Sequence, residues 1–301
     1  MRRKIDALMP YVYSTPFFIL LCAFMLLPFL LNIGLSITNY SLTRANVKLV
    51  GLKNYVDLLS DYHVTDAIGR TFVFIAGVVV CTMVLGVFYA LLMSWKIRGS
   101  GFLKAIILLP WIIPESVTGY VWKWLMTKDS GVLYYALLRA GLIQEGTSFF
   151  FEGSLAMALV IFVNVWRTAP FVAIMTYAKL KAIPTSHIEA AHIDGANAVQ
   201  TFLHITIPWL RPILERCVLL LFVWSFNSYS IIYIMTNGGP ASKTTTLPFL
   251  IRTKAFVNYN FGQATALAVI SLLLIVLSYA LLRGVLAAVQ QVRERRNPAN
   301  A

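Results

Sequence analysis

Six long apolar segments constrain the fold of this chain more than any other feature of its sequence. Crossing the hydrocarbon core of a bilayer, about 30 Å thick, takes about 20 apolar residues in a helix that rises about 1.5 Å per residue. Each of the six segments is long enough to do so. The sequence therefore predicts an all-α integral membrane protein with six transmembrane helices, at residues 11–37, 71–95, 105–126, 154–180, 213–235 and 264–287.

The composition agrees with a membrane protein. Hydrophobic residues make up 59% of the 301-residue chain and charged residues 12%, whereas a soluble domain carries about 25% charged residues. The formal net charge of +13 therefore has to be read against the membrane topology, and it is not by itself evidence for nucleic-acid binding. The three cysteines, Cys22, Cys81 and Cys217, lie within apolar segments, so we expect them to pack rather than to form disulfides or bind metal.

The distribution of lysine and arginine predicts the orientation of the chain in the membrane. These residues are denser in the short loops and tails of one side, and most acidic residues fall in the longer loops of the other. By the positive-inside rule, the denser side is cytoplasmic. We therefore expect both termini in the cytoplasm, with a tail at 1–10, a transmembrane domain at 11–290 and a tail at 291–301. The first apolar segment is too long for the core of a signal peptide and is expected to be retained.

A polar stretch between the fourth and fifth apolar segments predicts a helix, a turn and a second helix. Ser186 and Glu189 have the spacing of a capping box, which starts a helix. Gly195 follows where a left-handed residue can end that helix. Pro208 and Pro212 are expected to break the backbone before the next apolar segment.

This stretch resembles the EAA signature of permease subunits from binding-protein-dependent ABC importers, whose pattern is E-A-A, three residues, G, nine residues and I-x-L-P. Glu189-Ala190-Ala191, Gly195 and Ile205-Thr206-Ile207-Pro208 fill it, with Ile207 in the place of the usual leucine. The resemblance implies a type I ABC importer permease (MetI-like) fold and a cytoplasmic loop, at about 184–212, that docks on a separate ATPase subunit. The residues it assigns to ATPase coupling are Glu189, Ala190, Ala191, Asp194, Gly195 and Pro208. The alternative is an amphipathic loop helix that lies on the membrane surface.

Further matches resemble the carbohydrate branch of that family, which includes maltose, trehalose and glycerol-phosphate permeases. Thr236–Pro240 resembles its T-x-G-G-P turn, and Asn164 with Trp166 resembles an N-x-W element of its fourth span. Carried over by position, the resemblance implies a substrate path lined by Trp111, Glu115, Asn164, Arg167, Thr168, Phe171, Ser225 and Ser228. Glu115 and Arg167 depart from the maltose type, which has small residues there. Carboxylates, guanidinium groups and amides hydrogen-bond hydroxyls, and aromatic rings stack on sugar rings.

Glu115 and Arg167 stand at membrane depth, where an ionisable side chain is costly unless it faces a bundle interior or a water-filled cavity. The two could pair across the third and fourth spans. Such a pair would line a path or have a purely structural role, and the sequence favours neither. The serine and asparagine residues of the spans are open to the same two interpretations, because such residues often form interhelical contacts.

No catalytic chemistry is visible in the sequence. It has no phosphate loop of the form G-x-x-x-x-G-K-[ST], no nucleophile elbow and no metal-ligand spacing around its four histidines. The resemblance implies that two ATP-binding partner subunits hydrolyse ATP, that a second homologous permease subunit completes the path, and that an extracytoplasmic binding protein delivers a sugar-type substrate. We therefore expect a non-enzymatic subunit with no cofactor or metal of its own and no nucleic-acid partner, in a bacterial or archaeal cytoplasmic membrane.

A second hypothesis is a secondary transporter driven by an ion gradient, with Glu115 and Arg167 as a relay. That class predicts an internal repeat in hydropathy, and none is clear in this sequence. A membrane-embedded enzyme is a weaker third hypothesis, because no catalytic constellation accompanies the spans. Inhibition of uptake by vanadate or by a protonophore distinguishes the first two hypotheses.

Overall fold

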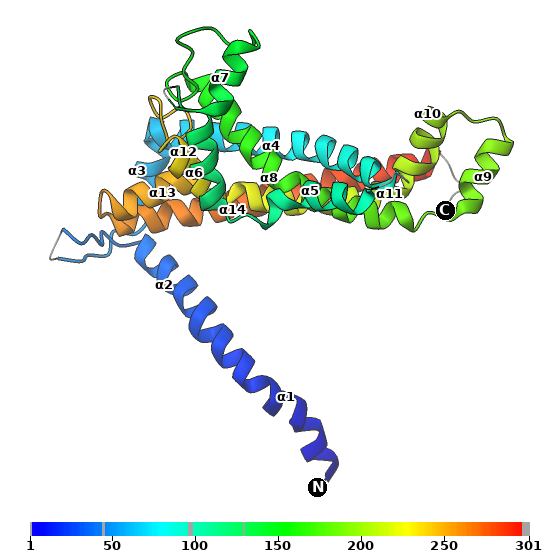
Figure 1. The fold of residues 1–301 in the computed structure, drawn as a ribbon. Coiled ribbons are helices and arrows are strands. Elements are labelled where there is room, and N and C mark those ends of the chain that lie inside the picture. The colour runs from blue at the N-terminus through cyan, green and yellow to red at the C-terminus, as the bar shows by residue number, and fades with distance from the viewer. Residues whose placement is uncertain (1, 44–45, 96–98, 129, 297–301) are drawn as a thin grey trace. The chain divides into compact units, whose positions relative to one another are not determined.

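The computed structural model describes residues 2–43, 46–95, 99–128 and 130–296. These residues form helices and one isolated β-bridge, between Thr38 and Leu49, and no strand occurs among them (Figure 1). This confirms the predicted all-α class. The chain divides into two compact units, Met1–Thr65 with Leu250–Leu274 and Asp66–Phe249 with Ile275–Ala301.

The first unit contains the N-terminal helices and two segments from late in the chain. Its helices are α1 (Arg2–Leu21), a π-helical turn η1 (Cys22–Leu26), α2 (Leu27–Ser36), α3 (Lys53–Ser60), most of α13 (Leu247–Phe256) and the start of α14 (Phe261–Arg296). The Asn54 amide of α3 donates to the backbone carbonyls of Ser36 and Thr38, at 2.8 and 2.7 Å. None of the most apolar part of Tyr13–Ser36 is buried within this chain, so lipid or another protein has to cover it.

The second unit is built around one long central helix, α8. Its helices are α4 (Tyr62–Ser94), α5 (Ser100–Ile112), α6 (Glu115–Leu125), α7 (Val132–Arg139), α8 (Gly153–Lys181), α9 (Thr185–Ile193), α10 (Ala198–Thr201), a π-helical turn η2 (Phe202–Thr206), α11 (Ile207–Phe226), α12 (Ser230–Met235) and the later part of α14. In the most apolar 18-residue stretch of α8, 61% of the residues are buried. Helices α5 and α11 pack against α8. A Cβ atom at Gly86 of α4 would lie 2.5 Å from Val172 Cβ, so glycine allows α4 to approach α8 closely.

Four helices in the described residues are long and apolar enough to cross a membrane: Tyr13–Ser36, Tyr62–Ser94, Gly153–Lys181 and Phe261–Ala288. Helices α5 and α6 make a fifth crossing segment if they count as one span, but they are bent by 100° at the break between them. The predicted third span is therefore broken at this point. Pro114 has no amide hydrogen for the next helical bond, and the residue before it, Ile113, is extended with ψ of 129°.

The predicted fifth span, 213–235, is also interrupted. Helix α11 ends at Phe226 and α12 begins at Ser230. The two helices are not among the segments that are long and apolar enough to cross a membrane. The described residues thus show four or five crossing segments, and six spans stay a prediction. Non-helical backbone at membrane depth is tolerated where it is buried in protein or lines a water-filled cavity. We therefore expect the residues around this break to be buried or to line a cavity.

Two π-helical turns each stand two residues before a proline. η1 precedes Pro28 and η2 precedes Pro208. The helix continues through Pro208, and Pro212 lies inside α11, so the prediction that these prolines break the backbone is wrong. A widened turn shifts the hydrogen-bond register just ahead of the residue that has no amide hydrogen, and the helix absorbs the proline there.

Candidate functional site

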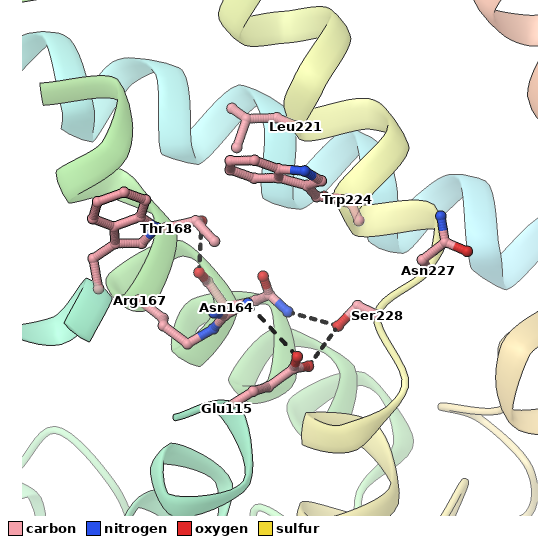
Figure 2. Close-up of a pocket in the computed structure, with 10 residues that line it drawn as sticks. Glu115, Asn164, Arg167, Thr168, Leu221, Trp224, Asn227 and Ser228 are labelled. Atoms are coloured by element: carbon pink, nitrogen blue, oxygen red, sulfur yellow. Dashed lines mark hydrogen bonds and ion pairs between the residues drawn. The ribbon is translucent and has the colours of Figure 1, made fainter. Parts of the chain in front are cut away.

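A cavity of about 410 Å³ opens within the second unit and collects most of the residues predicted for the substrate path. Its walls come from α5, α6, α8, α11 and the segment between α11 and α12 (Figure 2). The lining residues are Trp111, Glu115, Asn164, Arg167, Thr168, Leu221, Trp224, Ser225, Asn227 and Ser228. Seven of the eight predicted residues are among them, and Phe171 is not. The fold brings these side chains together, while their contact with a substrate stays a prediction.

A chain of polar contacts crosses the cavity. The Ser228 hydroxyl donates to Glu115 Oε1 at 3.2 Å, and Asn164 Nδ2 donates to the Ser228 hydroxyl oxygen at 3.0 Å. The Thr168 hydroxyl donates to the Asn164 carbonyl at 2.7 Å and lies 3.2 Å from the Thr82 hydroxyl of α4. Figure 2 shows the side chains from α6, α8 and the α11–α12 segment pointing toward one another. The buried side chains of Asn164, Thr168 and Ser228 thereby find partners, and the network joins α4, α6, α8 and the α11–α12 segment.

The predicted pairing of Glu115 and Arg167 is confirmed. Arg167 Nη2 lies 3.8 Å from Glu115 Oε2, and the two side chains keep 21% and 28% of their exposure, so the pair faces the cavity. Glu115 is the first residue of α6, where the helix macrodipole favours a negative charge. Arg167 Nε is buried and has no hydrogen-bond partner among the described residues. A guanidinium group has five N–H donors, and this geometry leaves some of them unused.

Aromatic rings lie beside the polar network. The ring centroids of Trp111 and Phe171 are 5.9 Å apart, and those of Phe171 and Trp224 are 4.7 Å apart. Phe171 is 9% exposed, whereas each tryptophan is 42% exposed. Phe171 therefore supports the two tryptophans from outside the lining, and the tryptophans provide the aromatic surface of the cavity.

Sequence reasoning missed Leu221, Trp224 and Asn227 as lining residues. Leu221 lies four residues before the predicted Ser225 in α11, so extending the helical periodicity backward from Ser225 identifies it. Trp224 is adjacent to Ser225 and falls outside that periodicity. Asn227 follows the last residue of α11, at an interruption that periodicity does not predict.

The polar loop forms two helices joined by a tight turn at Gly195. Helix α9 ends in a Schellman motif, in which the Gly195 amide donates to the His192 carbonyl at 3.1 Å and the Ala196 amide donates to the Ala191 carbonyl at 2.9 Å. Gly195 has φ of +78°, which confirms the predicted left-handed residue. Figure 1 shows α9 and α10 beyond the ends of α8 and α11, in the same unit.

The loop exposes most of the residues predicted to contact an ATPase. The exposed ones are Glu189, Ala190, Asp194 and Gly195. Ala191 is 8% exposed and packs inward, and Pro208 is half-buried in the first turn of α11. Ile193, next to the turn, is 86% exposed. The loop thus presents an apolar side chain flanked by carboxylates, while its role as a docking surface stays a prediction.

The predicted capping box at Ser186 and Glu189 is wrong. Helix α9 begins at Thr185 after Pro184, so Ser186 lies inside the first turn and cannot act as the cap. The capping box forms instead at the second helix, where the Gln200 amide donates to the Asn197 side chain at 2.9 Å and the Asn197 amide donates to the Gln200 side chain at 2.8 Å. Asparagine is among the strongest N-cap residues.

Trp209 fastens the two ends of the loop to each other. Its indole N–H donates to the Lys179 carbonyl at 3.2 Å, and the Lys179 ammonium lies 4.4 Å from the centre of the indole. The His187 ring of α9 packs edge-on against the same indole, at 6.0 Å between centroids. The Lys179 carbonyl belongs to the last turn of α8, where it also accepts a hydrogen bond from the Ala182 amide at 3.2 Å. One side chain of α11 therefore contacts both α8 and α9.

Comparisons with known proteins give the family context of these features. The family described as binding-protein-dependent transport system inner membrane component matches residues 82–291, which include the cavity and the loop. The chain is 29% identical over 274 residues to the trehalose/maltose transport system permease protein MalF of Thermococcus litoralis, with 90% of each protein covered. It is 29% identical over 269 residues to the sn-glycerol-3-phosphate transport system permease protein UgpA of Escherichia coli, with 89% of this chain and 90% of the relative covered.

Solved structures show the same fold. A chain in the crystal structure of a bacterial alginate ABC transporter, in complex with an alginate pentasaccharide-bound periplasmic protein, superimposes with a TM-score of 0.80 at 18% identity, covering 94% of this chain and 95% of that one. A chain of the MetNI methionine ABC transporter gives a TM-score of 0.52 at 18% identity, covering 76% of this chain and 96% of that one. These likenesses confirm the predicted MetI-like permease fold.

Proposed function

The chain belongs to the family of inner membrane components of binding-protein-dependent transport systems, and from this premise we propose that it is the permease subunit of an ATP-driven importer for a sugar or related solute. With a second homologous permease subunit it forms the translocation path. Its exposed loop couples that path to two separate ATP-binding subunits, and an extracytoplasmic solute-binding protein delivers the substrate.

One observation carries this proposal: two continuous helices connect the polar cavity to the exposed loop. Helix α8 runs from Thr168 at the cavity to Lys179 at the loop, and α11 runs from Trp209 at the loop to Ser225 at the cavity. At about 1.5 Å per residue, these distances are roughly 16 and 24 Å. Because helices transmit axial and rocking displacements as rigid elements, a movement imposed on the loop reaches the cavity walls.

The substrate class follows from the chemistry of the cavity. Carboxylate, guanidinium, amide and hydroxyl groups line it together with two tryptophans, and this combination suits a ligand that has many hydroxyls and a flat apolar face. Its volume of about 410 Å³ lies within the range of about 300–1,000 Å³ typical of small-molecule sites. The relatives named for trehalose/maltose and for sn-glycerol-3-phosphate support a polyhydroxylated substrate.

We further propose six spans in a bacterial or archaeal cytoplasmic membrane, with α5 and α6 as the broken third span and α11 and α12 as the broken fifth. Both termini then lie in the cytoplasm, and the domain at 11–290 contains the transport machinery. The loop at about 184–212 meets the ATPase there. ATP hydrolysis belongs to the partner subunits, so this subunit needs no cofactor.

Uptake measurements test the proposal. Radiolabelled maltose and trehalose are offered, with the cognate binding protein, to right-side-out membrane vesicles that contain the chain and its partners. We expect vanadate to abolish uptake and a protonophore to leave it unchanged. In the ion-coupled alternative, the Glu115–Arg167 pair is the candidate relay. Loss of uptake with the protonophore but not with vanadate would support a relay through that pair.

A further inference from the structure

A second cavity of the same unit lies in the groove between α11 and the later part of α14, which we call the α11–α14 groove. Its polar end, of about 240 Å³, is lined by Glu215, Arg216 and Arg283 among others. Its apolar end, of about 640 Å³, is lined by Leu220, Val223, Ile275, Val276 and Tyr279. Arg216 and Arg283 line both ends, so the groove is continuous and changes from cationic to apolar along its length.

The polar end is net positive. Arg216 and Arg283 are both exposed, and no ion pair with either is found among the described residues. The carboxylate of Glu215 lies in the same end, where it accepts a hydrogen bond from Arg211 Nε at 2.6 Å. Two guanidinium groups therefore line the polar end together with one carboxylate that is already paired with Arg211, which leaves the polar end suited to an anion.

The depth of the two arginines matches the surface of a bilayer. Arg216 precedes Trp224 of the transport cavity by eight residues, about 12 Å along the helix. Transporter sites lie near the bilayer midplane, and half of the hydrocarbon core is about 15 Å. Arg283 lies near the end of the apolar stretch Phe261–Ala288. Both guanidinium groups therefore stand near the headgroup level, and the apolar end of the groove extends from there toward the membrane interior.

We propose that the α11–α14 groove binds one anionic glycerophospholipid. The lipid phosphate accepts hydrogen bonds from Arg216 and Arg283, since guanidinium groups bind phosphate oxygens in pairs, and one acyl chain lies along Leu220, Val223 and Val276. Basic pockets between transmembrane helices are known to hold anionic head groups. A zwitterionic lipid would add a cation to an end that is already net positive, so the site selects a net negative lipid. The proposal rests on the proposed function for placing the chain in a membrane and the transport cavity near the bilayer midplane.

Native mass spectrometry of the purified transporter complex tests this site. The complex is mixed with equal amounts of phosphatidylglycerol and phosphatidylcholine that have identical acyl chains. We expect the wild type to retain one phosphatidylglycerol with a preference of roughly tenfold, and the R216Q/R283Q variant to lose that preference. R139Q removes one positive charge from an exposed position of α7, outside the groove, and is expected to retain the preference. Inorganic phosphate in excess is not expected to displace the lipid.

A second variant addresses the apolar end. Val276 is 54% exposed, and Val276→Trp fills the groove without changing its charge, so it is expected to lower phosphatidylglycerol retention while the complex still assembles by size-exclusion chromatography. Equal retention of both lipids by the wild type, or unchanged preference in R216Q/R283Q, would overturn the site. So would a disulfide that Leu220→Cys forms with a cysteine of the second permease subunit, because protein would then fill the groove. A complex that imports sugar but shows no lipid preference refutes the lipid site alone.

Discussion

Ser228 donates a hydrogen bond to Glu115 across 3.2 Å and so joins the first turn of α6 to the interruption between α11 and α12. The same hydroxyl accepts a hydrogen bond from Asn164 of α8 at 3.0 Å. Both broken segments of the second unit therefore meet at one side chain in the wall of the cavity. The breaks replace the backbone pairing of a continuous helix with side-chain contacts, and these contacts face the space proposed for the substrate.

We predict that Ser228→Ala impairs transport strongly, although it removes only one hydroxyl group. Removing the hydroxyl leaves both Glu115 and Asn164 short of a partner, and an unsatisfied buried group costs about 1–3 kcal/mol. The apparent KM for sugar uptake should rise, and the thermal unfolding temperature of the complex should fall. Ser230→Ala, two residues away, is the matched control. Equal effects of the two variants would show that Ser228 has no special role.

The Glu115–Arg167 pair permits a double-mutant cycle. We expect Glu115→Gln and Arg167→Gln each to raise the KM for sugar, and the double variant to raise it less than the two effects combined, because the partners interact. Since the pair is partly exposed, its coupling energy should be about 1 kcal/mol. The thermal unfolding of the complex is measured in parallel. A change in unfolding temperature with an unchanged KM would assign the pair to a purely structural role.

Gly195→Val should separate ATP hydrolysis from transport. Nothing lies within 4 Å of a Cβ built at Gly195, so the cost comes from the backbone: a β-branched residue disfavours φ of +78° by about 1–2 kcal/mol. We expect the turn to shift, uptake to fall and ATP hydrolysis to continue, while Gly195→Asn retains more uptake. Gly141→Val carries a comparable strain, at φ of +69° in open space, outside the loop. Full uptake by Gly195→Val would contradict the assignment of the turn to coupling.

Trp209→Phe tests the fastening of the loop. The variant keeps a ring beneath the Lys179 ammonium but loses the indole N–H that bonds the Lys179 carbonyl, a loss of about 1 kcal/mol. A moderate decrease in uptake per ATP hydrolysed is expected, and a larger decrease in Trp209→Ala. Trp124, 57% exposed on α6, provides the control Trp124→Ala. Wild-type coupling ratios in both Trp209 variants would show that the loop needs no such contact.

Gly86→Ala probes the approach of α4 to α8. The added Cβ would stand 2.5 Å from Val172 Cβ, and overpacking of this kind costs about 1–3 kcal/mol. The unfolding temperature of the complex should drop measurably. Gly101→Ala has no atom within 4 Å of the new Cβ and should be neutral or slightly stabilising. A neutral Gly86→Ala would mean that the two helices are further apart than described.

The sequence predicted the all-α class, the Gly195 turn and the Glu115–Arg167 pair because each depends on local chemistry: apolar length, a left-handed residue, and the cost of an unpaired charge in a membrane. It did not predict where helices break. Pro114 interrupts a helix, whereas Pro110 and Pro212 lie inside one, and this outcome depends on neighbouring contacts rather than on proline itself.

The cavity was predictable as a set of residues but not as a shape. The motif positions identified seven lining residues. The lining position of Trp224, and the packing of Phe171 behind the two tryptophans, depend on how α5, α8 and α11 pack together. The α11–α14 groove was not predicted, because Arg216 and Arg283 are 67 residues apart in the sequence and only the fold brings them to one groove.

The most direct test of the account is a pull-down of this chain from detergent-solubilised native membranes, with mass spectrometry of the proteins that accompany it. The account predicts an ATP-binding subunit, a second permease of the same family and a solute-binding protein in the recovered complex. Recovery of the chain alone or only as a self-oligomer, under conditions that preserve membrane complexes, would contradict the importer assignment and favour the ion-coupled alternative.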